Sequence, residues 1–414
     1  MTTNEDQPYF QAEAGLLDRR VYSDPDVYVR ELEQVFGRCW LFLGPEDWVR
    51  EPGNLIATSM GDAPVILWRG LDAQLRAFLN VCPASERKVT VAEHGRFETL
   101  DCSCHGLTFG ADGVALQDAR FQLAQAPRVD VYKGLVFACW DPEAPDLLAY
   151  LGDIAWYLDT LLDRREGGAE PIGGLMKCNV ETNWKLPVDA FAGDVYREPV
   201  SHASLAIFPS SFIATLGVDQ GFQISAGAGS LAALWEVDPD DQRGPRLAAY
   251  EAEHRAEFEA RLGHVRAVQL RPQVGFVFPN LCIHWRTGSL HVWHPRGPLK
   301  SEVWTYCFAD RAAPIEVQTD LRRQCQLYFG PAGIESQDDA AIWSSIAKNA
   351  AGTIAVRHPL NLQMGLGHER YHEDLPGRVS NVLSEMNQRA FYATWQRLLK
   401  DDGTAANVHL EAPE

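Results

Sequence analysis

The sequence predicts an α+β protein of two domains: a small all-β domain, then a larger domain whose antiparallel sheet curls around a long helix. Three observations predict this class. With 414 residues, the chain exceeds the usual limit for a single hydrophobic core. Residues 40–140 contain short strand-like runs separated by turn pairs. In the remainder, strands follow one another without the regular alternation with helices that βαβ units require.

The first half of the chain begins with an acidic arm and a helix. Asp24-Pro25-Asp26 is typical of a helix start, and apolar residues then recur near helical spacing up to residue 37. Gly-Asp, Pro-Gly and Asp-Gly pairs bound the strands that follow. The expected elements are strands at 63–68, 74–81 and 131–140, then a linker and a helix at 147–162 within residues 141–170.

The second half is predicted to open with a strand at 176–181, which leads into one helix over 183–204. The amphipathic pattern of residues 384–399 indicates a closing helix. Between them we expect strands at 211–224, 232–236, 273–282, 289–294 and 300–308, a helix at 315–327 and another starting near residue 337.

Composition excludes several classes of protein. The net charge of −19 disfavours nucleic acid and anionic membrane surfaces as partners, and no run of eighteen apolar residues could cross a membrane. The polar, acidic start does not resemble a signal or transit peptide. Without a secretory signal, the nine scattered cysteines favour reduced thiols or metal ligands over disulfides, so we expect a cytoplasmic protein.

The stretch from Asn183-Trp184-Lys185 through Asp194 to His202 resembles the mononuclear-iron segment of Rieske non-haem iron ring-hydroxylating oxygenase α subunits. Matches in the same order cover nearly the whole chain. They include residues 39–44, 77–82, 102–107, 277–281, 292–298, 329–339, 363–367 and 384–389.

The resemblance implies a Rieske-type domain and a helix-grip (START/SRPBCC-like) catalytic-type domain. Its expected boundaries are 1–38 for an arm that packs with the catalytic-type domain, 39–155 for the Rieske-type domain, and 156–414 for the catalytic-type domain.

The Rieske ligand motif is incomplete. Such a [2Fe-2S] cluster takes two thiolates and two imidazoles from Cys-x-His and Cys-x-x-His loops. The resemblance assigns Cys82, Cys102 and His105 as cluster ligands, but Ala84 stands at the position of the first histidine. Three outcomes stay open: an empty site, an altered cluster, or zinc held by these three residues together with Cys104.

The iron motif is incomplete as well. The resemblance assigns His202 and Asp339 as metal ligands and Asp194 as the catalytic bridging carboxylate, whereas Arg197 stands at the first histidine position. A guanidinium cannot ligate a metal. At about 5 Å from a divalent ion it would also cost roughly 7 kcal/mol at an effective dielectric near 20. We therefore expect Arg197 to pair with Asp194 or Asp339 in a metal-free site; the alternative for Asp194 is a helix-surface carboxylate.

Other histidines do not form an independent site in the sequence. His284, His291 and His294 fall on neighbouring strands and are expected to be core or hydrogen-bonded residues. His368 and His372 follow a glycine-rich loop, so a helical metal pair is not expected there.

The favoured interpretation is an α-like subunit that binds neither the cluster nor Fe(II). It would serve a structural or regulatory role beside a competent α subunit, in a trimer-based oligomer that in this family often includes β subunits. Two alternatives stay open. One is an active oxygenase acting on an aromatic or polycyclic acid with non-standard ligands. The other is metal-free binding or lyase-type chemistry, with Arg197 holding a substrate carboxylate.

Overall fold

The computed structural model describes residues 8–203, 220–237, 244–400 and 410. The chain forms two compact units. The smaller unit is Leu32–Leu147, and the larger unit comprises the described parts of Met1–Glu31 and of the chain from Leu148 onward. The boundaries expected after residues 38 and 155 lie later in the chain than these contact boundaries.

The smaller unit is built from short antiparallel strands. Its described strands form a four-stranded sheet in the order β6-β5-β4-β7, a three-stranded sheet β10-β11-β3 and a β8-β9 pair. The strands are β3 (Leu41–Pro45), β4 (Asn54–Met60), β5 (Ala63–Arg69), β6 (Leu75–Leu79), β7 (His94–Arg96), β8 (Leu100–Asp101), β9 (Thr108–Phe109), β10 (Arg128–Tyr132) and β11 (Leu135–Cys139). Trp68, Phe78 and Phe109 are fully buried in a shared core. The expected all-β domain is confirmed.

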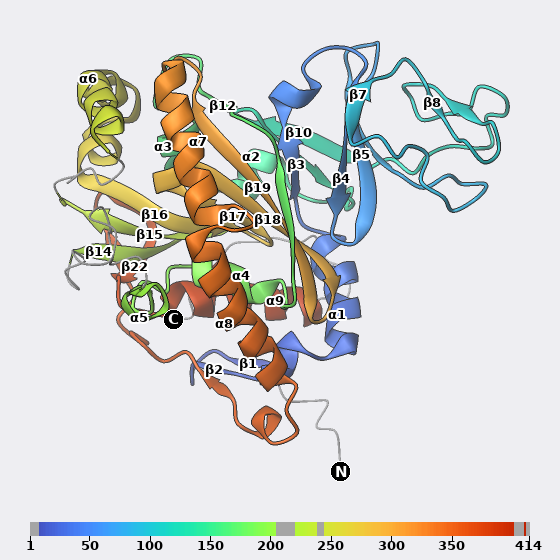
Figure 1. Cartoon of the computed structure of the whole chain (residues 1–414). Coiled ribbons are helices and arrows are strands. Elements are labelled where there is room, and N and C mark those ends of the chain that lie inside the picture. The colour runs from blue at the N-terminus through green and yellow to red at the C-terminus, as the bar shows by residue number, and fades with distance from the viewer. Residues whose placement is uncertain (1–7, 204–219, 238–243, 401–409, 411–414) are drawn as a thin grey trace. The chain divides into compact units, whose positions relative to one another are not determined.

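One large antiparallel sheet dominates the larger unit (Figure 1). Its strand order is β12-β19-β18-β17-β16-β15-β14-β22-β21, and β13 also pairs with β19. The strands are β12 (Ala169–Pro171), β13 (Met176–Val180), β14 (Gly221–Ala226), β15 (Gly229–Trp235), β16 (Leu270–Val277), β17 (Leu281–His284), β18 (Ser289–Gly297), β19 (Lys300–Asp310), β21 (Arg370–His372) and β22 (Leu375–Asn381). A separate small sheet joins β1 (Phe10–Gln11), β2 (Leu16–Leu17) and β20 (Leu360–Asn361).

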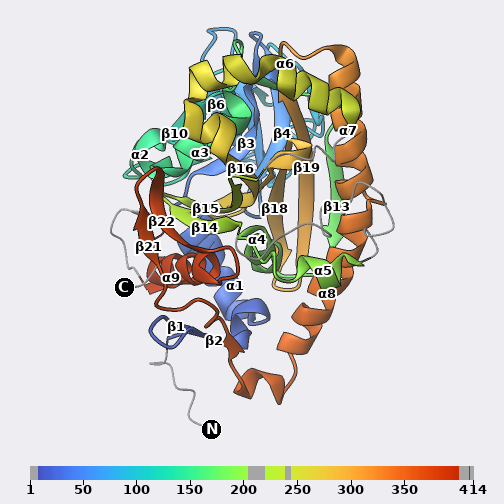
Figure 2. The ribbon, with the colours of Figure 1, turned by 90° about the vertical axis from the view of Figure 1, so that its left-hand side faces the viewer.

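Helices cover this sheet. The apolar face of α9 packs on it, with the Phe391 ring centroid 5.6 Å from that of Phe276 and 5.4 Å from that of Phe278. Figure 2 shows α7 and α8 following one another down one side of the unit, with α6 across its top. The helices are α1 (Pro25–Glu31), α2 (Leu147–Leu151), α3 (Ile154–Leu162), α4 (Lys185–Phe191), α5 (Glu198–Ser201), α6 (Pro245–Leu262), α7 (Ile315–Phe329), α8 (Ile334–Ala350) and α9 (Met386–Lys400).

A buried ion pair joins the N-terminal arm to the rest of the larger unit. The Lys185 Nζ atom of α4 lies 2.5 Å from the Glu31 Oε1 atom of α1, and both side chains are fully buried. Glu31 also accepts hydrogen bonds from the indole N–H groups of Trp184 and Trp395. Because each carboxylate oxygen has a donor, the charge is tolerated in the core.

Several expected elements divide where the backbone turns. The strand expected at 131–140 is the hairpin β10–β11, which turns at Lys133 and Gly134, both with positive φ. The helix expected at 147–162 breaks into α2 and α3 at Gly152. The strand expected at 273–282 is β16 and β17, separated at Phe278-Pro279. Of the strand expected at 211–224, residues 211–219 lie outside the described part.

The helix expected over 183–204 is also divided, and that prediction was wrong in this respect. Helix α4 ends at Phe191 and α5 begins at Glu198, so Asp194 lies in the connection between them. Helix α6 was not predicted from the sequence. Its boundary residues could have predicted it, because Gly244 precedes the helix, Pro245 is its first residue and Gly263 follows it.

Candidate functional site

The connection between α4 and α5 is shaped by Gly193. Its φ of +115° is unfavourable for other residues, and an added Cβ would lie 2.7 Å from the Cβ of Ala232 on β15. The Gln223 side chain holds the loop by donating from Nε2 to the Gly193 carbonyl oxygen at 2.8 Å. This turn brings Asp194 and Arg197 together near the start of α5.

Arg197 forms the expected ion pair. Its Nη2 atom lies 2.7 Å from Asp194 Oδ2 and 3.8 Å from Asp339 Oδ1, so Asp194 is the closer partner. All three side chains are at most a quarter exposed. We call Asp194, Arg197, His202 and Asp339 the carboxylate–arginine centre.

His202 and Asp339 complete the centre. The imidazole follows α5 and the carboxylate lies on α8, and His202 Nε2 is 3.5 Å from Asp339 Oδ1. His202 Nδ1 is 3.7 Å from Asp338 Oδ2. Within the described part of the chain, His202 Nδ1 and Asp339 Oδ1 are buried and have no hydrogen-bond partner. The structure therefore brings together the four residues that the sequence assigned to this centre.

Burial and charge set the protonation states of these residues. Burial raises the pKa of Asp194 to about 6 and that of Asp339 to about 7, and in both cases the Arg197 guanidinium acts in the opposite direction. Burial, and then the charge of Arg197, lowers the pKa of His202 below its ordinary value. At neutral pH the imidazole is thus neutral, and Arg197 is the cation that balances the carboxylates.

A tyrosine–carboxylate network beside the centre was not predicted. Asp189 of α4 accepts hydrogen bonds from the hydroxyls of Tyr392 at 3.1 Å and Tyr22 at 3.3 Å. Burial, and then repulsion by Asp194, raises the pKa of Asp189 to about 7. Tyr196 donates to Glu385 at 3.2 Å. No sequence spacing identifies this network, because its members come from distant segments.

Of the histidines on the sheet, His284 and His291 form hydrogen bonds and His294 packs in the core. His284 Nδ1 lies 2.8 Å from Thr287 Oγ1. His291 lies 2.8 Å from Ser289 Oγ and 3.0 Å from Thr305 Oγ1. His294 is buried against Trp304, with ring centroids 4.7 Å apart. These are the core and hydrogen-bonded roles expected for them.

A small cavity of about 110 Å³ adjoins Asp339. Its walls come from α4, α8, the end of α7 and the strands β13, β18 and β19. The lining includes four aromatic side chains, those of Phe191, Trp293, Phe329 and Trp343. The carboxylate–arginine centre therefore borders an apolar space.

In the smaller unit, Cys82 and Cys102 lie close together. Both are buried in the core that also contains Trp68, and Ala84 packs against that core. Burial acts to raise the pKa of the Cys102 thiol, but hydrogen bonds from the Cys104 backbone and from Cys82 bring it below its ordinary value. Cys104 is exposed, as is His105.

Neither donor set fits the group that the resemblance implies. A methyl group at Ala84 cannot replace an imidazole, so the cluster loops supply three ligands of four. At the iron position, His202 and Asp339 are two ligands of a three-ligand set, and a guanidinium lies 3.8 Å from the carboxylate oxygen. Among the residues that the structure describes, no three His, Cys, Asp or Glu side chains are placed to hold a metal. The alternative of zinc on Cys82, Cys102, Cys104 and His105 thus has no assembled donor set.

Within the described residues, no helix is long and apolar enough to span a membrane.

Comparison with known proteins covers both units. The family model of the ring-hydroxylating alpha subunit catalytic domain matches residues 149–401, and that of the Rieske [2Fe-2S] domain matches residues 39–127. Biphenyl dioxygenase subunit alpha of Metapseudomonas furukawaii is 36% identical, over 95% of this chain and 93% of the relative. Benzene 1,2-dioxygenase subunit alpha of Pseudomonas putida is 34% identical, over 96% and 94%.

A solved structure of naphthalene 1,2-dioxygenase with indole bound in the active site superposes with a TM-score of 0.90. That structure is 28% identical and covers 97% of this chain and 96% of its own. Family models, relatives and fold agree along nearly the full length, so the chain belongs to the family of ring-hydroxylating dioxygenase α subunits.

Proposed function

We propose that this chain is a catalytically silent α-type subunit of an aromatic ring-hydroxylating dioxygenase system. It binds neither a Rieske cluster nor mononuclear iron. It assembles in the cytoplasm with a competent α subunit, and with β subunits where the system has them, in a trimer-based oligomer. Its contribution is structural or regulatory.

The single observation that carries this proposal is the ion pair of Arg197. In relatives the cation beside these carboxylates is the metal, whereas here a guanidinium lies 2.7 Å from Asp194 and 3.8 Å from Asp339. A fixed internal cation stabilises the same carboxylates without a bound ion. The residues at the centre therefore maintain the fold around it, and no step of oxygen chemistry is assigned to them.

The smaller unit supports the same proposal. Ala84 stands where the resemblance expects a polar ligand, and its side chain packs against the core that contains Trp68 and Phe78. Electron transfer through this unit requires a complete cluster, which a loop with three of four ligands does not hold. Similarity to biphenyl dioxygenase subunit alpha nevertheless extends over 95% of the chain.

Cluster and iron content test the loss of both groups. The chain is purified anaerobically with iron and sulfide supplied, beside the variants Ala84→His and Arg197→His. We expect the unaltered chain to lack stoichiometric iron, labile sulfide and the visible absorption of a Rieske cluster.

Arg197→His is expected to bind Fe(II), because it restores the ligand set with His202 and Asp339. Arg197→Gln serves as its control, since it removes the charge without adding a ligand. A stoichiometric cluster or iron in the unaltered chain would refute the proposal.

Co-purification tests the partner. A tagged chain isolated from its native host is expected to bring down an α subunit that has complete cluster and iron motifs. A chain that is recovered alone or only with copies of itself, at native expression level, contradicts the assembly role.

One observation favours a second candidate, an active oxygenase with non-standard ligands acting on an aromatic or polycyclic acid. His202 Nδ1 and Asp339 Oδ1 lack hydrogen-bond partners within the described residues, as metal ligands would in the absence of metal. Oxygen uptake coupled to hydroxylated product, with ferredoxin and reductase supplied and this chain as the only α subunit, would establish that candidate. We expect no such uptake. The further idea that Arg197 holds a substrate carboxylate is disfavoured, because Asp194 already occupies its guanidinium.

A further inference from the structure

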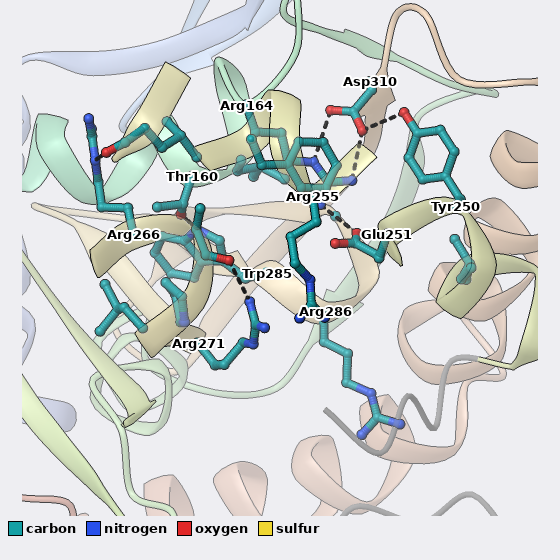
Figure 3. Close-up of a pocket in the computed structure, with 18 of the residues that line it drawn as sticks. Thr160, Arg164, Tyr250, Glu251, Arg255, Arg266, Arg271, Trp285, Arg286 and Asp310 are labelled. Atoms are coloured by element: carbon teal, nitrogen blue, oxygen red, sulfur yellow. Dashed lines mark hydrogen bonds and ion pairs between the residues drawn. The ribbon is translucent and has the colours of Figure 1, made fainter. Parts of the chain in front are cut away.

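A cavity of about 430 Å³ in the larger unit has acids that are neutralised within its own wall (Figure 3). Arg164 Nη1 lies 2.6 Å from Glu251 Oε1, and the same guanidinium lies 2.9 and 2.8 Å from the two carboxylate oxygens of Asp310. Tyr250 also donates to Asp310 at 2.9 Å. These contacts stabilise the wall of the cavity and do not indicate the charge of a ligand.

The smaller unit contains a different feature, a pair of thiols in contact with each other. Cys82 is fully buried, Cys102 is 1% exposed, and both belong to one hydrophobic core. The Cys82 thiol forms a hydrogen bond with the Cys102 sulfur. Because Ala84 leaves the loops without their fourth cluster ligand, the two thiols are free to react with each other.

Backbone hydrogen bonds close the first cysteine loop, residues 82–87, on Cys82. The Cys82 N–H group donates to the Arg87 carbonyl oxygen at 2.7 Å. The Glu86 N–H group donates back to the Cys82 carbonyl oxygen at 3.0 Å. Glu86 has a φ of +57°, so the chain turns sharply here. Cys82 is therefore held at the base of a tight loop.

The second cysteine loop, residues 102–107, is closed on Cys102 in the same way. The Cys102 N–H group donates to the Leu107 carbonyl oxygen at 2.8 Å, and the Gly106 N–H group donates to the Cys102 carbonyl oxygen at 3.0 Å. Ser85 of the first loop contacts the second, with its Oγ atom 3.9 Å from Cys102 Sγ. Both loops thus hold their sulfur atoms toward each other from closed backbones.

This arrangement suits a disulfide. Such a bond requires two cysteines with neighbouring backbones and with side chains directed at each other. The hydrogen bond between the thiols shows that the side chains meet this requirement. Formation of the S–S bond removes two electrons and two protons from the thiols. A low-molecular-weight disulfide such as oxidised glutathione accepts them and is reduced to two thiols.

We propose that Cys82 and Cys102 form a redox-sensitive disulfide that joins the two cysteine loops in place of a metal cluster. The oxidant is a low-molecular-weight disulfide. This inference rests on the proposed absence of the cluster, because a cluster would engage both sulfur atoms. In a reducing compartment the bond forms under oxidising conditions and is reversed by thiols.

Peptide mapping tests the bond directly. The cluster-free full chain is treated with millimolar oxidised glutathione, and the remaining thiols are then alkylated under denaturing conditions. We expect most of the protein to yield one linked peptide pair, containing Cys82 and Cys102, which dithiothreitol separates. Recovery of the two cysteines as free thiols or as separate glutathione adducts overturns the proposal. A link from either of them to the exposed Cys104 overturns it as well.

Matched variants identify the partners. Cys82→Ser and Cys102→Ser should each abolish the linked peptide, whereas Cys104→Ser should retain it. Cys139→Ser is the control for a buried thiol of the same unit outside the two loops, and it should also retain the link. Mapping of the unaltered chain keeps the test decisive if a serine variant does not fold.

The melting temperature tests whether the loops are placed for the bond. Linked Cys104→Ser protein should melt about 5 °C or more above the same protein after reduction, because the bond restricts the unfolded chain. The Cys104→Ser background removes the exposed thiol, which would otherwise carry a glutathione adduct. A linked protein that melts at a lower temperature than the reduced one overturns the proposal.

Iron and labile sulfide analysis of the same preparation separates this inference from the proposed function. A stoichiometric cluster refutes the proposed function, and the free thiol pair is lost with it. A cluster-free protein that yields no linked peptide overturns the disulfide alone.

Discussion

Arg197 balances the charge of the carboxylate–arginine centre. Its guanidinium is three-quarters buried and lies between two carboxylates from different segments, Asp194 and Asp339. A buried pair of this kind adds little stability compared with an apolar replacement, but removing one partner leaves a costly unpaired charge.

Arg197→Ala is therefore expected to lower the free energy of unfolding by about 3–5 kcal/mol at neutral pH. Chemical denaturation measures the loss. The double variant Arg197→Ala/Asp194→Asn should recover part of it, because the closer carboxylate is then neutral. An effect below about 1 kcal/mol in the single variant would mean that solvent, not Arg197, stabilises the carboxylates.

Asp189, beside the carboxylate–arginine centre, makes the stability of the chain depend on pH. Its pKa is raised to about 7 in the folded chain, first by burial and then by Asp194, against about 3.9 when unfolded. The folded state thus holds a proton that the unfolded state releases. Between about pH 4 and pH 7, Asp189 lowers the stability progressively as the pH rises.

Asp189→Asn should remove this contribution while keeping an oxygen for the hydroxyls of Tyr22 and Tyr392. We expect the variant to gain roughly 1–2 kcal/mol relative to the unaltered chain between pH 4 and pH 7, after allowance for partial exposure. Unfolding curves at several pH values test this. Parallel pH profiles for the two proteins would show that Asp189 is already ionised in the folded state throughout.

At the scale of elements, the interruption between α4 and α5 decides where the site residues lie. A continuous helix would have placed Asp194 and Arg197 one turn apart on its surface. Instead, Gly193 with its positive φ turns the chain against β15, and the loop carries both residues to α8.

Gly193→Ala should lower the free energy of unfolding by about 1–3 kcal/mol, since it combines an unfavourable φ with a close approach to Ala232. Gly263→Ala, which has a φ of +81° but no neighbour within 4 Å, is the matched control. The difference between the two variants isolates the steric part. Equal losses would mean that β15 moves aside without cost.

One buried ion pair between α1 and α4 contributes to the attachment of the N-terminal arm. Lys185→Met leaves Glu31 charged and without its cation, so we expect a loss of about 3–5 kcal/mol. The double variant Lys185→Met/Glu31→Gln should recover most of it, because the glutamine oxygen still accepts from Trp184 or Trp395. Thermal denaturation of both variants tests the coupling. If the double variant is no more stable than the single one, packing and not charge accounts for the loss.

At the scale of the whole molecule, the described structure contains nine free cysteines with very different environments. Cys104 is exposed, whereas Cys39, Cys82, Cys102, Cys139, Cys282, Cys307 and Cys325 are buried. Burial raises the pKa of Cys139 to about 12, which leaves almost no reactive thiolate near neutral pH.

Alkylation of the metal-free native chain at pH 8 should therefore modify Cys104 rapidly and Cys139 only after global unfolding. Peptide mapping after timed reaction with iodoacetamide measures both rates. Cys104→Ser is the control and should remove the fast phase. Rapid native labelling of Cys139 would show that the smaller unit opens locally.

The sequence by itself determined the class of fold, the order of most elements and the family. Strand periodicity in residues 40–140 and the motifs around Asn183 and Asp194 are local features, so they could be interpreted without tertiary structure. The prediction that Ala84 and Arg197 replace ligands also came from residue type alone. The local sequence pattern did not predict the element ends at glycine and proline. The helix expected at 183–204 and the strand expected at 273–282 are both divided at such positions.

Only the tertiary structure decided which side chains meet. Asp194 is nearer to Arg197 than Asp339 is, because of the turn between α4 and α5 and the position of α8. The network of Asp189 with Tyr22 and Tyr392 joins residues far apart in the chain. Burial, which sets the pKa of each carboxylate, is a property of packing between distant segments, and local sequence pattern does not contain it.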